Sequence, residues 1–264
     1  MPWRETIPAP APAPSDMPQF GGWAALYHRY RPQYPPHLYA LLAQTVAGRG
    51  VCVELGAGTG QATLDLKTMF SSVIAVEPDA AMAGLIPVRQ GLAVIQAPAE
   101  SALIASGEAD AVVVATALHW MDVPRVLARA AGWLKPGGVF FACTFATSQY
   151  PGAPPAATSV MRRYSKMWRS HMHERLSSWQ PAEAYFLAAP DYEAVQSFEI
   201  YTDFHWSPAE VAGFLMTTSF AQAFAAGDGE AILAELTRDL EIATDGAGLA
   251  VRFPIEGAWT RRRA

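Results

Sequence analysis

The chain has 264 residues, of which 51% are hydrophobic, and its formal net charge is −5. This length suits one domain with a smaller cap, and the acidic balance disfavours nucleic-acid binding, which usually needs a basic face. No apolar run reaches the roughly 18 residues that a membrane helix needs. The two cysteines, Cys52 and Cys143, lie in apolar stretches, which favours the cytoplasm over a disulfide-forming compartment.

The first part of the chain predicts a disordered leader followed by two helices. Residues 1–18 alternate proline with alanine and contain no secretory h-region. A short helix is expected at 22–30, where it ends because Arg31 precedes a proline. A second helix is expected at 37–46, after the opening pair Pro35-Pro36.

Short runs that are apolar on both faces come next, as is typical of strands buried between helices. The predicted strands are 51–55, 73–76, 92–95, 111–115 and 139–144, and the predicted helices between them are 61–69, 80–88 and 123–133. A turn is expected at Lys135–Gly138, between the last helix and the last strand. This alternation predicts the α/β class, with a doubly wound and mostly parallel sheet.

The regular alternation lapses after about residue 148. A Pro/Gly/Ala/Ser loop is expected at 150–159, followed by a helix at 160–179 rich in Met, Arg and Trp. A strand at 198–206, helices at 208–225 and 230–243, and a last strand at 249–255 complete the predicted elements. An antiparallel pair at the sheet edge with an inserted helical cap would accommodate them.

The segment Val51–Gly60 reads Val-Cys-Val-Glu-Leu-Gly-Ala-Gly-Thr-Gly. A strand runs into three glycines, which permit a tight turn and a close approach of the backbone to a ligand. Glu77 ends the second strand about twenty residues later, where a nucleotide-binding fold places an acid for the ribose hydroxyls. The alternative role for Glu77 is a helix cap, because Pro78-Asp79 begins the next helix. A redox fingerprint spaces its glycines G-x-G-x-x-G, so the spacing here disfavours hydride transfer.

The sequence from Glu54 to Gly60 resembles motif I of the class I S-adenosylmethionine-dependent methyltransferases. The resemblance implies a seven-stranded Rossmann-like sheet, S-adenosylmethionine as cofactor, and Glu54 at the amino-acid end of that cofactor. It extends to Ala97-Pro98-Ala99-Glu100, where the family contacts adenine, although Pro98 lacks the usual polar side chain. The segments Tyr27–Pro35 and Thr116–Asp122 are similar to the small-molecule branch that includes trans-aconitate methyltransferase.

The resemblance implies two sets of contact residues. The expected cofactor contacts are Tyr27, Arg31, Glu54, Gly56, Ala57, Gly58, Glu77, Pro78, Ala99, Glu100, Thr116 and His119. The expected acceptor contacts are Tyr30, Trp120, Phe145, Trp168 and Ser219. His119 is also the candidate catalytic residue, as a base or a positioning group; its alternative role is to fix the Thr116 loop or to stack beside the cofactor.

Methyl transfer from a sulfonium is an in-line displacement, so the protein mainly positions the acceptor and excludes water. No metal is required, and none is expected, because His171 and His173 would point to different faces of a helix. The last prediction about the site concerns its position: the acceptor would lie between the fourth strand and the cap, outside the carboxyl ends of the strands.

The implied organisation is a methyltransferase domain at 19–264. It comprises an N-terminal helical cover at 19–47, a cofactor-binding half at 48–147, the cap and edge strand at 148–225, and a C-terminal helix and strand at 226–264. The implied function is methylation of a small molecule (a carboxylate, hydroxyl, amine or carbon) in metabolite or natural-product biosynthesis. We expect a cytoplasmic monomer or homodimer with no nucleic-acid or membrane partner.

Three other functions remain open at this stage. One is a non-catalytic protein that retains the cofactor pocket, and a second is a nucleotide-dependent oxidoreductase. The third is a nucleic-acid or protein methyltransferase. It is disfavoured by the net charge and by the lack of an Asn/Asp-Pro-Pro-aromatic segment.

Overall fold

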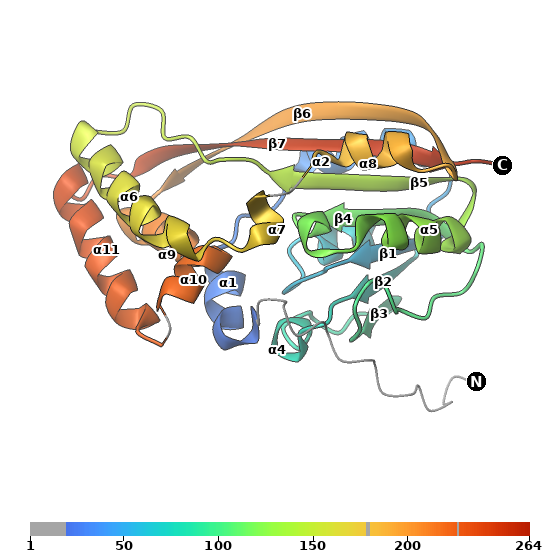
Figure 1. Ribbon diagram of the computed structural model, residues 1–264, viewed down its shortest axis with the longest axis horizontal. Helices are drawn as coiled ribbons and strands as arrows, with labels where there is room; N and C mark the ends of the chain where they lie inside the picture. The colour runs from blue at the N-terminus through green and yellow to red at the C-terminus, as the bar shows by residue number, and fades with distance from the viewer. Residues whose placement is uncertain (1–19, 178–179, 226) are drawn as a thin grey trace.

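The computed structural model describes residues 20–177, 180–225 and 227–264, and its centre is a seven-stranded sheet (Figure 1). The strand order is β3-β2-β1-β4-β5-β7-β6. The bounds are β1 Val51–Leu55, β2 Ser72–Val76, β3 Leu92–Ile95, β4 Ala109–Ala115, β5 Leu134–Phe145, β6 Tyr192–Trp206 and β7 Leu249–Arg262. The first five strands are parallel, and β7 runs antiparallel to both β5 and β6. The predicted fold class is confirmed, and the predicted leader at 1–18 lies outside the described residues.

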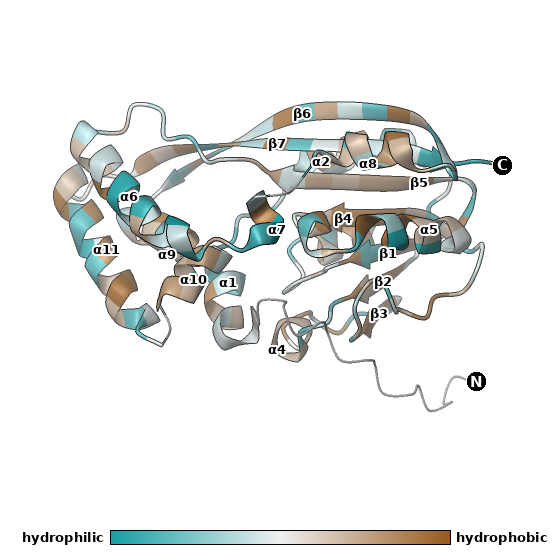
Figure 2. Cartoon of the chain, viewed as in Figure 1, coloured by the Kyte–Doolittle hydropathy of each residue, from teal (hydrophilic) through white to brown (hydrophobic). Residues whose placement is uncertain are grey.

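Helices cover both faces of the sheet because its strands are apolar on both faces (Figures 1 and 2). On β4, Val112 and Val114 pack towards α5 (Val123–Trp133) and α8 (Ala182–Ala188). Their neighbours Ala111 and Val113 point the other way, into the cluster of α2 (Pro36–Thr45) and α3 (Thr63–Met69). The short helix α4 (Ala80–Ala83) follows β2. The period-two alternation of each strand therefore builds two cores, one on each face.

A helical cap lies beyond the carboxyl ends of the parallel strands, at the left of Figure 1. It consists of α6 Pro155–Trp168, α9 Pro208–Met216, α10 Ser219–Ala225 and α11 Gly229–Thr244, with α1 Ala24–Tyr30 against α9 and α7 Glu174–Ser177 nearest the sheet. Its core joins Trp168, Val211, Leu236 and Leu240 to Phe253 of β7. Because Leu236 and Leu240 belong to α11, this helix packs as part of the cap.

Several predicted boundaries were wrong. The helix expected at 160–179 ends at Trp168 and begins earlier, at Pro155. It can begin there because a proline at the first helical position loses no hydrogen bond. Residues 178–179 lie outside the described part of the chain. The helix expected at 208–225 is divided into α9 and α10 at Thr217 and Thr218, whose hydroxyls donate back to the carbonyls of Phe214 and Leu215.

The strands at the antiparallel edge are longer than predicted, and the turn expected at Lys135–Gly138 is a bulge inside β5. Backbone hydrogen bonds to a neighbouring strand extend these strands into residues that are not apolar, so the apolar runs underestimate their length. At the end of β7, Arg261 donates to the carbonyl of Thr45 at 2.6 Å, and Arg262 donates to the carbonyl of Leu134. The basic tail of the sequence is therefore engaged with the backbone.

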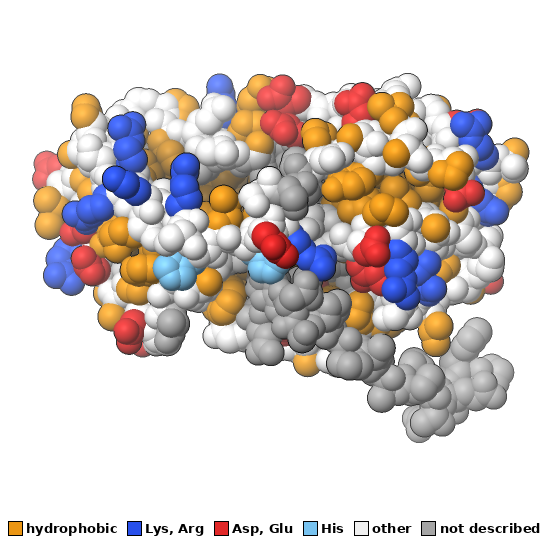
Figure 3. All heavy atoms as spheres, in the orientation of Figure 1, with side chains coloured by type: hydrophobic (Ala, Val, Ile, Leu, Met, Phe, Trp, Pro, Cys, Tyr) orange, Lys and Arg blue, Asp and Glu red, His pale blue; other side chains and the backbone are white. Residues whose placement is uncertain are grey.

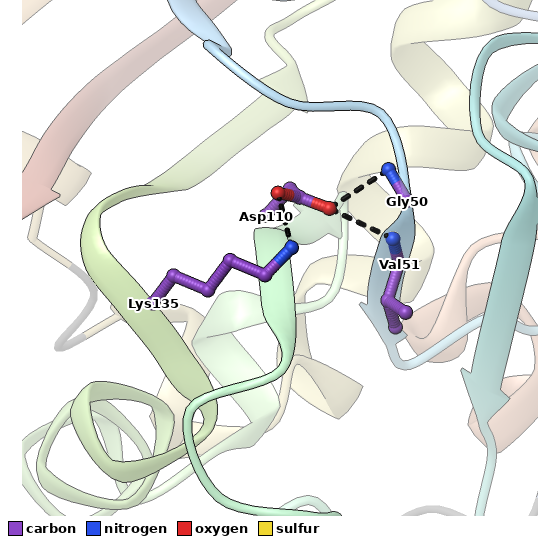
Figure 4. Close-up of polar contacts among 4 residues, drawn as sticks. All are labelled: Gly50, Val51, Asp110 and Lys135. Atoms are coloured by element: carbon purple, nitrogen blue, oxygen red, sulfur yellow. Dashed lines mark hydrogen bonds and ion pairs between the residues drawn. The ribbon is translucent and has the colours of Figure 1, made fainter.

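Asp110 joins the starts of three elements at the end of the sheet opposite the cap (Figure 4). One of its carboxylate oxygens accepts the N–H groups of Gly50 and Val51, at 2.8 and 2.9 Å. The other accepts Lys135 Nζ at 2.7 Å. Burial acts to raise the pKa of Asp110, but these hydrogen bonds outweigh it and hold the pKa below its usual value.

We expect Asp110→Ala to lower the free energy of unfolding by about 2 kcal/mol, because two backbone donors and an ammonium lose a charged acceptor. Because the pKa of Asp110 is lower in the folded state, its carboxylate stabilises the fold at pH values above its unfolded pKa of about 4. This stabilisation is lost as the pH falls through the folded-state pKa. Denaturant unfolding at pH 7 and pH 3 measures both effects. Asp203→Asn is the matched control, because the Asp203–Arg252 pair is exposed. An equal loss in both variants would contradict this role for Asp110.

Candidate functional site

The glycine loop after β1 turns sharply beneath the cap. Gly56 and Gly58 have φ values of 68° and 58°, in the left-handed region that side chains disfavour. The N–H groups of Gly56 and Ala57 both donate to the carbonyl of Val76, at 2.8 and 3.1 Å, which fixes the loop against the end of β2. A Cβ atom at Gly56 would lie 2.4 Å from Cβ of Ala117. The loop therefore requires glycine for both its conformation and its close approach to the β4 end.

Glu54, at the end of β1, is a buried carboxyl with one polar partner. It is 2% exposed, and Thr63 Oγ1 donates to its Oε2 at 2.6 Å. Burial raises the pKa of Glu54 to about 8, although the Thr63 hydrogen bond acts in the opposite direction. A cationic group in the pocket would shift this carboxyl towards its ionised form.

Glu77, at the end of β2, holds the glycine loop and the start of α4. Its Oε2 accepts Gly58 N–H at 2.8 Å, and its Oε1 accepts Asp79 N–H at 3.0 Å. Burial raises the pKa of Glu77 to about 6, against the effect of these backbone donors. The N-cap of α4 is Asp79, whose carboxylate accepts the N–H groups of Ala81 and Met82. Glu77 therefore does not cap α4 and retains acceptor capacity towards a ligand.

A pocket of about 930 Å³ lies at the carboxyl ends of β1, β2 and β4, where the strand order reverses. The structure brings twelve of the predicted contact residues to its wall. They are Tyr27, Arg31, Glu54, Gly56, Ala57, Gly58, Glu77, Pro78, Ala99, Glu100, Thr116 and Trp120. Segments from residue 27 to residue 120 thus converge on one cavity, although what each residue contacts there stays a prediction.

The structure places His119 behind the pocket rather than on its wall. Its ring lies 4.9 Å from that of Trp120, and it lines a second, smaller cavity of about 200 Å³ with Pro181 and Phe198. Burial, with a smaller effect of the Arg31 charge, lowers the pKa of His119 to about 4. The imidazole is therefore neutral at pH 7, and a pKa this low makes it a weak base.

Four predicted acceptor contacts also lie away from the pocket wall. Phe145 stacks behind a lining residue, Tyr34, with ring centroids 4.8 Å apart. Tyr30 packs against Gly213, where an added Cβ atom would lie 2.4 Å from its ring. Trp168 is 1% exposed in the cap core, and Ser219 begins α10. Only Trp120 of the predicted acceptor set lines the pocket.

The pocket wall includes residues that the sequence analysis did not select. They are Pro32, Tyr34, Gln61, Ala62, Asp79, Ala80, Ala81, Met82, Pro98, Ser101, Ala115, Ala117, Met121, Asp122, Arg125 and Arg175. Tyr34 belongs to the Tyr27–Pro35 segment, so its motif was a usable signal. Arg175, in α7, donates to the carbonyl of Trp120 at 2.7 Å, and no local pattern predicts that contact.

Arg31 is held at the pocket by aromatic rings and a hydroxyl. Its guanidinium carbon lies 5.2 Å from the ring centroid of Tyr27 and 5.5 Å from that of Phe214, and its Nη1 donates to Thr217 Oγ1 at 3.1 Å. Within the described residues, no carboxylate forms an ion pair with Arg31. Its positive charge is available to a bound ligand.

The pocket fits S-adenosylmethionine by size and by chemistry. Gly56, Ala57 and Gly58 bring the backbone to the pocket wall, Glu77 offers acceptors for ribose hydroxyls, and Glu54 offers a partner for the amino group. Within the described residues, His, Cys, Asp and Glu side chains form no group of three or more that suits a metal ion. None of the described helices has the length and apolar composition to cross a membrane.

Comparison with known proteins identifies the central part of the chain. Residues 53–142 match the methyltransferase domain family. An uncharacterized methyltransferase of Mycobacterium tuberculosis is 36% identical over 121 residues, which are 45% of this chain and 49% of that protein. The chain spans about half the length of the mycobacterial relatives that it matches.

Two solved structures extend the likeness beyond that domain. A protein of Anaeromyxobacter dehalogenans assigned as a type II methyltransferase is 27% identical and superposes with a TM-score of 0.71, covering 88% of this chain and 98% of its own. Phosphoethanolamine N-methyltransferase 2 of Haemonchus contortus, in complex with S-adenosyl-L-methionine, shares the fold at a TM-score of 0.53 and 12% identity, covering 93% of this chain and 57% of its own. The predicted class I fold is confirmed, as is a methyltransferase domain over residues 53–142, and S-adenosylmethionine is the cofactor that this assignment implies. The trans-aconitate branch stays a prediction.

Proposed function

Because residues 53–142 form a methyltransferase domain, we propose that this protein transfers a methyl group from S-adenosylmethionine to a small-molecule acceptor. One observation carries the proposal. A single pocket joins the glycine loop, Glu54 and Glu77 to a second wall made by Tyr34, Thr116 and other residues of the cover and β4. Cofactor and acceptor would then share one cavity, as an in-line transfer requires.

The strand order supports a division of this pocket into two halves. Glu77 and Ala99 follow β2 and β3, which lie on one side of β1, so the ribose and adenine belong on that side. Thr116 follows β4, which lies on the other side of β1. The acceptor therefore belongs over β4 and β5, under the wall formed by Arg31 and Trp120.

The pocket volume of about 930 Å³ is in the range of about 300–1,000 Å³ found for small-molecule sites. Three arginines line the pocket, Arg31, Arg125 and Arg175, and Arg31 lies on the acceptor side, whereas Glu54 and Glu77 lie on the cofactor side. This charge distribution favours an acceptor with an anionic or strongly polar group. A carboxylic acid or a biosynthetic intermediate with oxygen functions meets that description.

We also propose that the acceptor is a free metabolite and not a nucleic acid, and that the protein works in the cytoplasm as a monomer or homodimer. On the face drawn in Figure 3, the Lys and Arg side chains at the centre and right have acidic side chains beside them, whereas those over the cap at the left form a loose group. Both cysteines are buried and unpaired, which suits a reducing compartment.

A methyl-donor assay tests the proposed function. Purified protein is supplied with S-adenosylmethionine and a panel of carboxylic acids, phenols, alcohols and amines, and methylated products are identified by mass spectrometry. We expect cofactor binding with an affinity in the micromolar range and turnover of at least one compound class. Cofactor binding without turnover of any class would favour the non-catalytic alternative, and tight binding of nicotinamide dinucleotides instead would contradict the proposal.

The proposal predicts that cofactor binding is linked to protonation. Glu54, with a pKa of about 8, is largely protonated at pH 7, but it must ionise to pair with an amino group. We expect binding at pH 7 to release about one proton, so that affinity falls about tenfold per pH unit below about pH 8, and more steeply below about pH 6 as Glu77 is also protonated. Titration calorimetry in buffers of different ionisation enthalpy measures the proton count. Glu54→Gln should abolish the release; an unchanged proton count in this variant would contradict the assignment.

A further inference from the structure

Thr116, the residue after β4, has a backbone conformation that is rare for its side chain. Its φ is +55°, in the left-handed region, where a β-branched residue is a genuine outlier that costs about 1–3 kcal/mol. Its N–H donates to the carbonyl of Cys143 at 2.7 Å, which holds this conformation. Glycine would adopt the same backbone without that cost. The presence of a strained threonine at the pocket wall indicates that its hydroxyl has a role there.

The hydroxyl of Thr116 forms a pair with the hydroxyl of Tyr34. The two oxygens are 2.7 Å apart, and Phe145 N–H donates to the Thr116 oxygen at 3.3 Å. The ring of Tyr34 is fixed by stacking on Phe145, and the whole residue is only 7% exposed. Burial raises the pKa of Tyr34 well above its usual value, so its phenol keeps its proton at physiological pH.

The count of protons in this pair leaves one donor free. Two hydroxyls carry two protons, and only one of them lies in the hydrogen bond between the two oxygens. Among the described residues, no other acceptor lies within hydrogen-bond distance of either hydroxyl. An unsatisfied buried donor costs about 1–3 kcal/mol. Both side chains line the pocket, so the partner of the free proton is a molecule in the pocket.

The position of the Tyr34–Thr116 hydroxyl pair indicates which bound molecule accepts this hydrogen bond. Tyr34 and Thr116 lie at the β4 and β5 ends, away from Glu77 and Ala99, which follow β2 and β3. The pair is therefore on the acceptor side of the pocket. An oxygen acceptor can take a hydrogen bond with one lone pair and keep another for methyl transfer. A neutral amine nitrogen has a single lone pair, which the same hydrogen bond would occupy.

We propose that the Tyr34–Thr116 hydroxyl pair donates a hydrogen bond to an oxygen of the acceptor, and that Tyr34 is a positioning residue for O-methylation. This inference rests on the proposed function and deepens it. It assigns a role to a tyrosine of the N-terminal cover, and it restricts the reactive compounds to those that present an oxygen. It also accounts for the threonine at a position that glycine would occupy without strain.

The test compares variants of the pair with the acid or phenol that the panel assay finds to be methylated. We expect Tyr34→Phe to lower kcat/KM by about tenfold or more, since it removes the hydroxyl but keeps the stacked ring. Its dissociation constant for S-adenosylhomocysteine, measured by calorimetry, should change less than twofold. Thr116→Ser should keep most of the activity, whereas Thr116→Gly should lose as much as Tyr34→Phe while its melting temperature stays close to that of the wild type. The double variant Tyr34→Phe/Thr116→Gly should lower kcat/KM by no more than either single variant does.

The matched control is Tyr39→Phe, which removes another tyrosine hydroxyl from the N-terminal cover, outside the pocket wall. It should leave kcat/KM unchanged. The proposal is overturned if Tyr34→Phe keeps kcat/KM within twofold, if it weakens S-adenosylhomocysteine binding by the same factor, or if only amines are methylated. A wild-type protein that binds the cofactor but methylates nothing would contradict the proposed function itself, and this inference with it.

Discussion

Gly56→Ala should destabilise the protein by about 3 kcal/mol and abolish measurable cofactor binding. Two effects add at this position. The left-handed backbone at φ 68° costs a side chain about 1–2 kcal/mol, and the new Cβ atom would lie 2.4 Å from Cβ of Ala117. Relief of that clash requires the loop to move away from the β4 end, at a further cost of about 1–3 kcal/mol. Denaturant unfolding and calorimetry with S-adenosylhomocysteine measure the two losses.

Gly107→Ala is the control that separates the two effects. Gly107 has the same φ of 68°, but a Cβ atom there would have no neighbour within 4 Å. Its substitution should therefore cost only the backbone strain, and cofactor affinity should not change. If both variants lose the same stability and Gly56→Ala still binds the cofactor normally, the close approach of Gly56 to Ala117 is not a requirement of the site.

Glu77→Ala should weaken cofactor binding by about 30- to 150-fold, which corresponds to about 2–3 kcal/mol. The substitution removes the acceptor that we assign to the ribose hydroxyls. It also releases the N–H of Gly58, which donates to this carboxylate at 2.8 Å and helps to hold the glycine loop. Calorimetry at pH 8, where the wild-type carboxyl with its pKa of about 6 is ionised, gives the full difference.

Glu77→Gln distinguishes charge from shape at this site. Glutamine keeps one acceptor oxygen and the length of the side chain, so its affinity should fall between those of the wild type and Glu77→Ala. The additional decline in wild-type affinity below about pH 6 that comes from Glu77 should disappear in this variant, whereas the decline linked to ionisation of Glu54 should remain. Unchanged affinity in both Glu77 variants would limit this residue to holding the backbone.

The central half of the fold was predictable because its signals are local. Buried parallel strands are continuous apolar runs, and the glycine loop, Glu54 and Glu77 occur at fixed spacings along the chain. Each of these features can be recognised from a few neighbouring residues in the sequence. The structure accordingly places these residues together at the pocket wall.

The acceptor half was harder to predict because its wall is built by contacts between distant segments. Tyr30 and Trp168 have the aromatic character of pocket residues, but packing against Gly213 and inside the cap core decides their position. His119 is adjacent to Trp120 in sequence, yet the short helix at Leu118–Trp120 places the two rings at different cavities. Arg175, which also lines the wall, donates to the carbonyl of Trp120, 55 positions earlier in the chain.

The bond between Arg31 and Thr217 spans 186 positions of the chain, and it bears on the order of events during synthesis. The glycine loop, Glu77 and β4 have all been synthesised when about half of the chain has been made. Arg31 by then lacks α9, since Phe214 and Thr217 are translated much later. Closing so long a loop is entropically costly and slow. The segments that form the cofactor side of the pocket are thus available to fold well before α9, which completes the wall on the acceptor side.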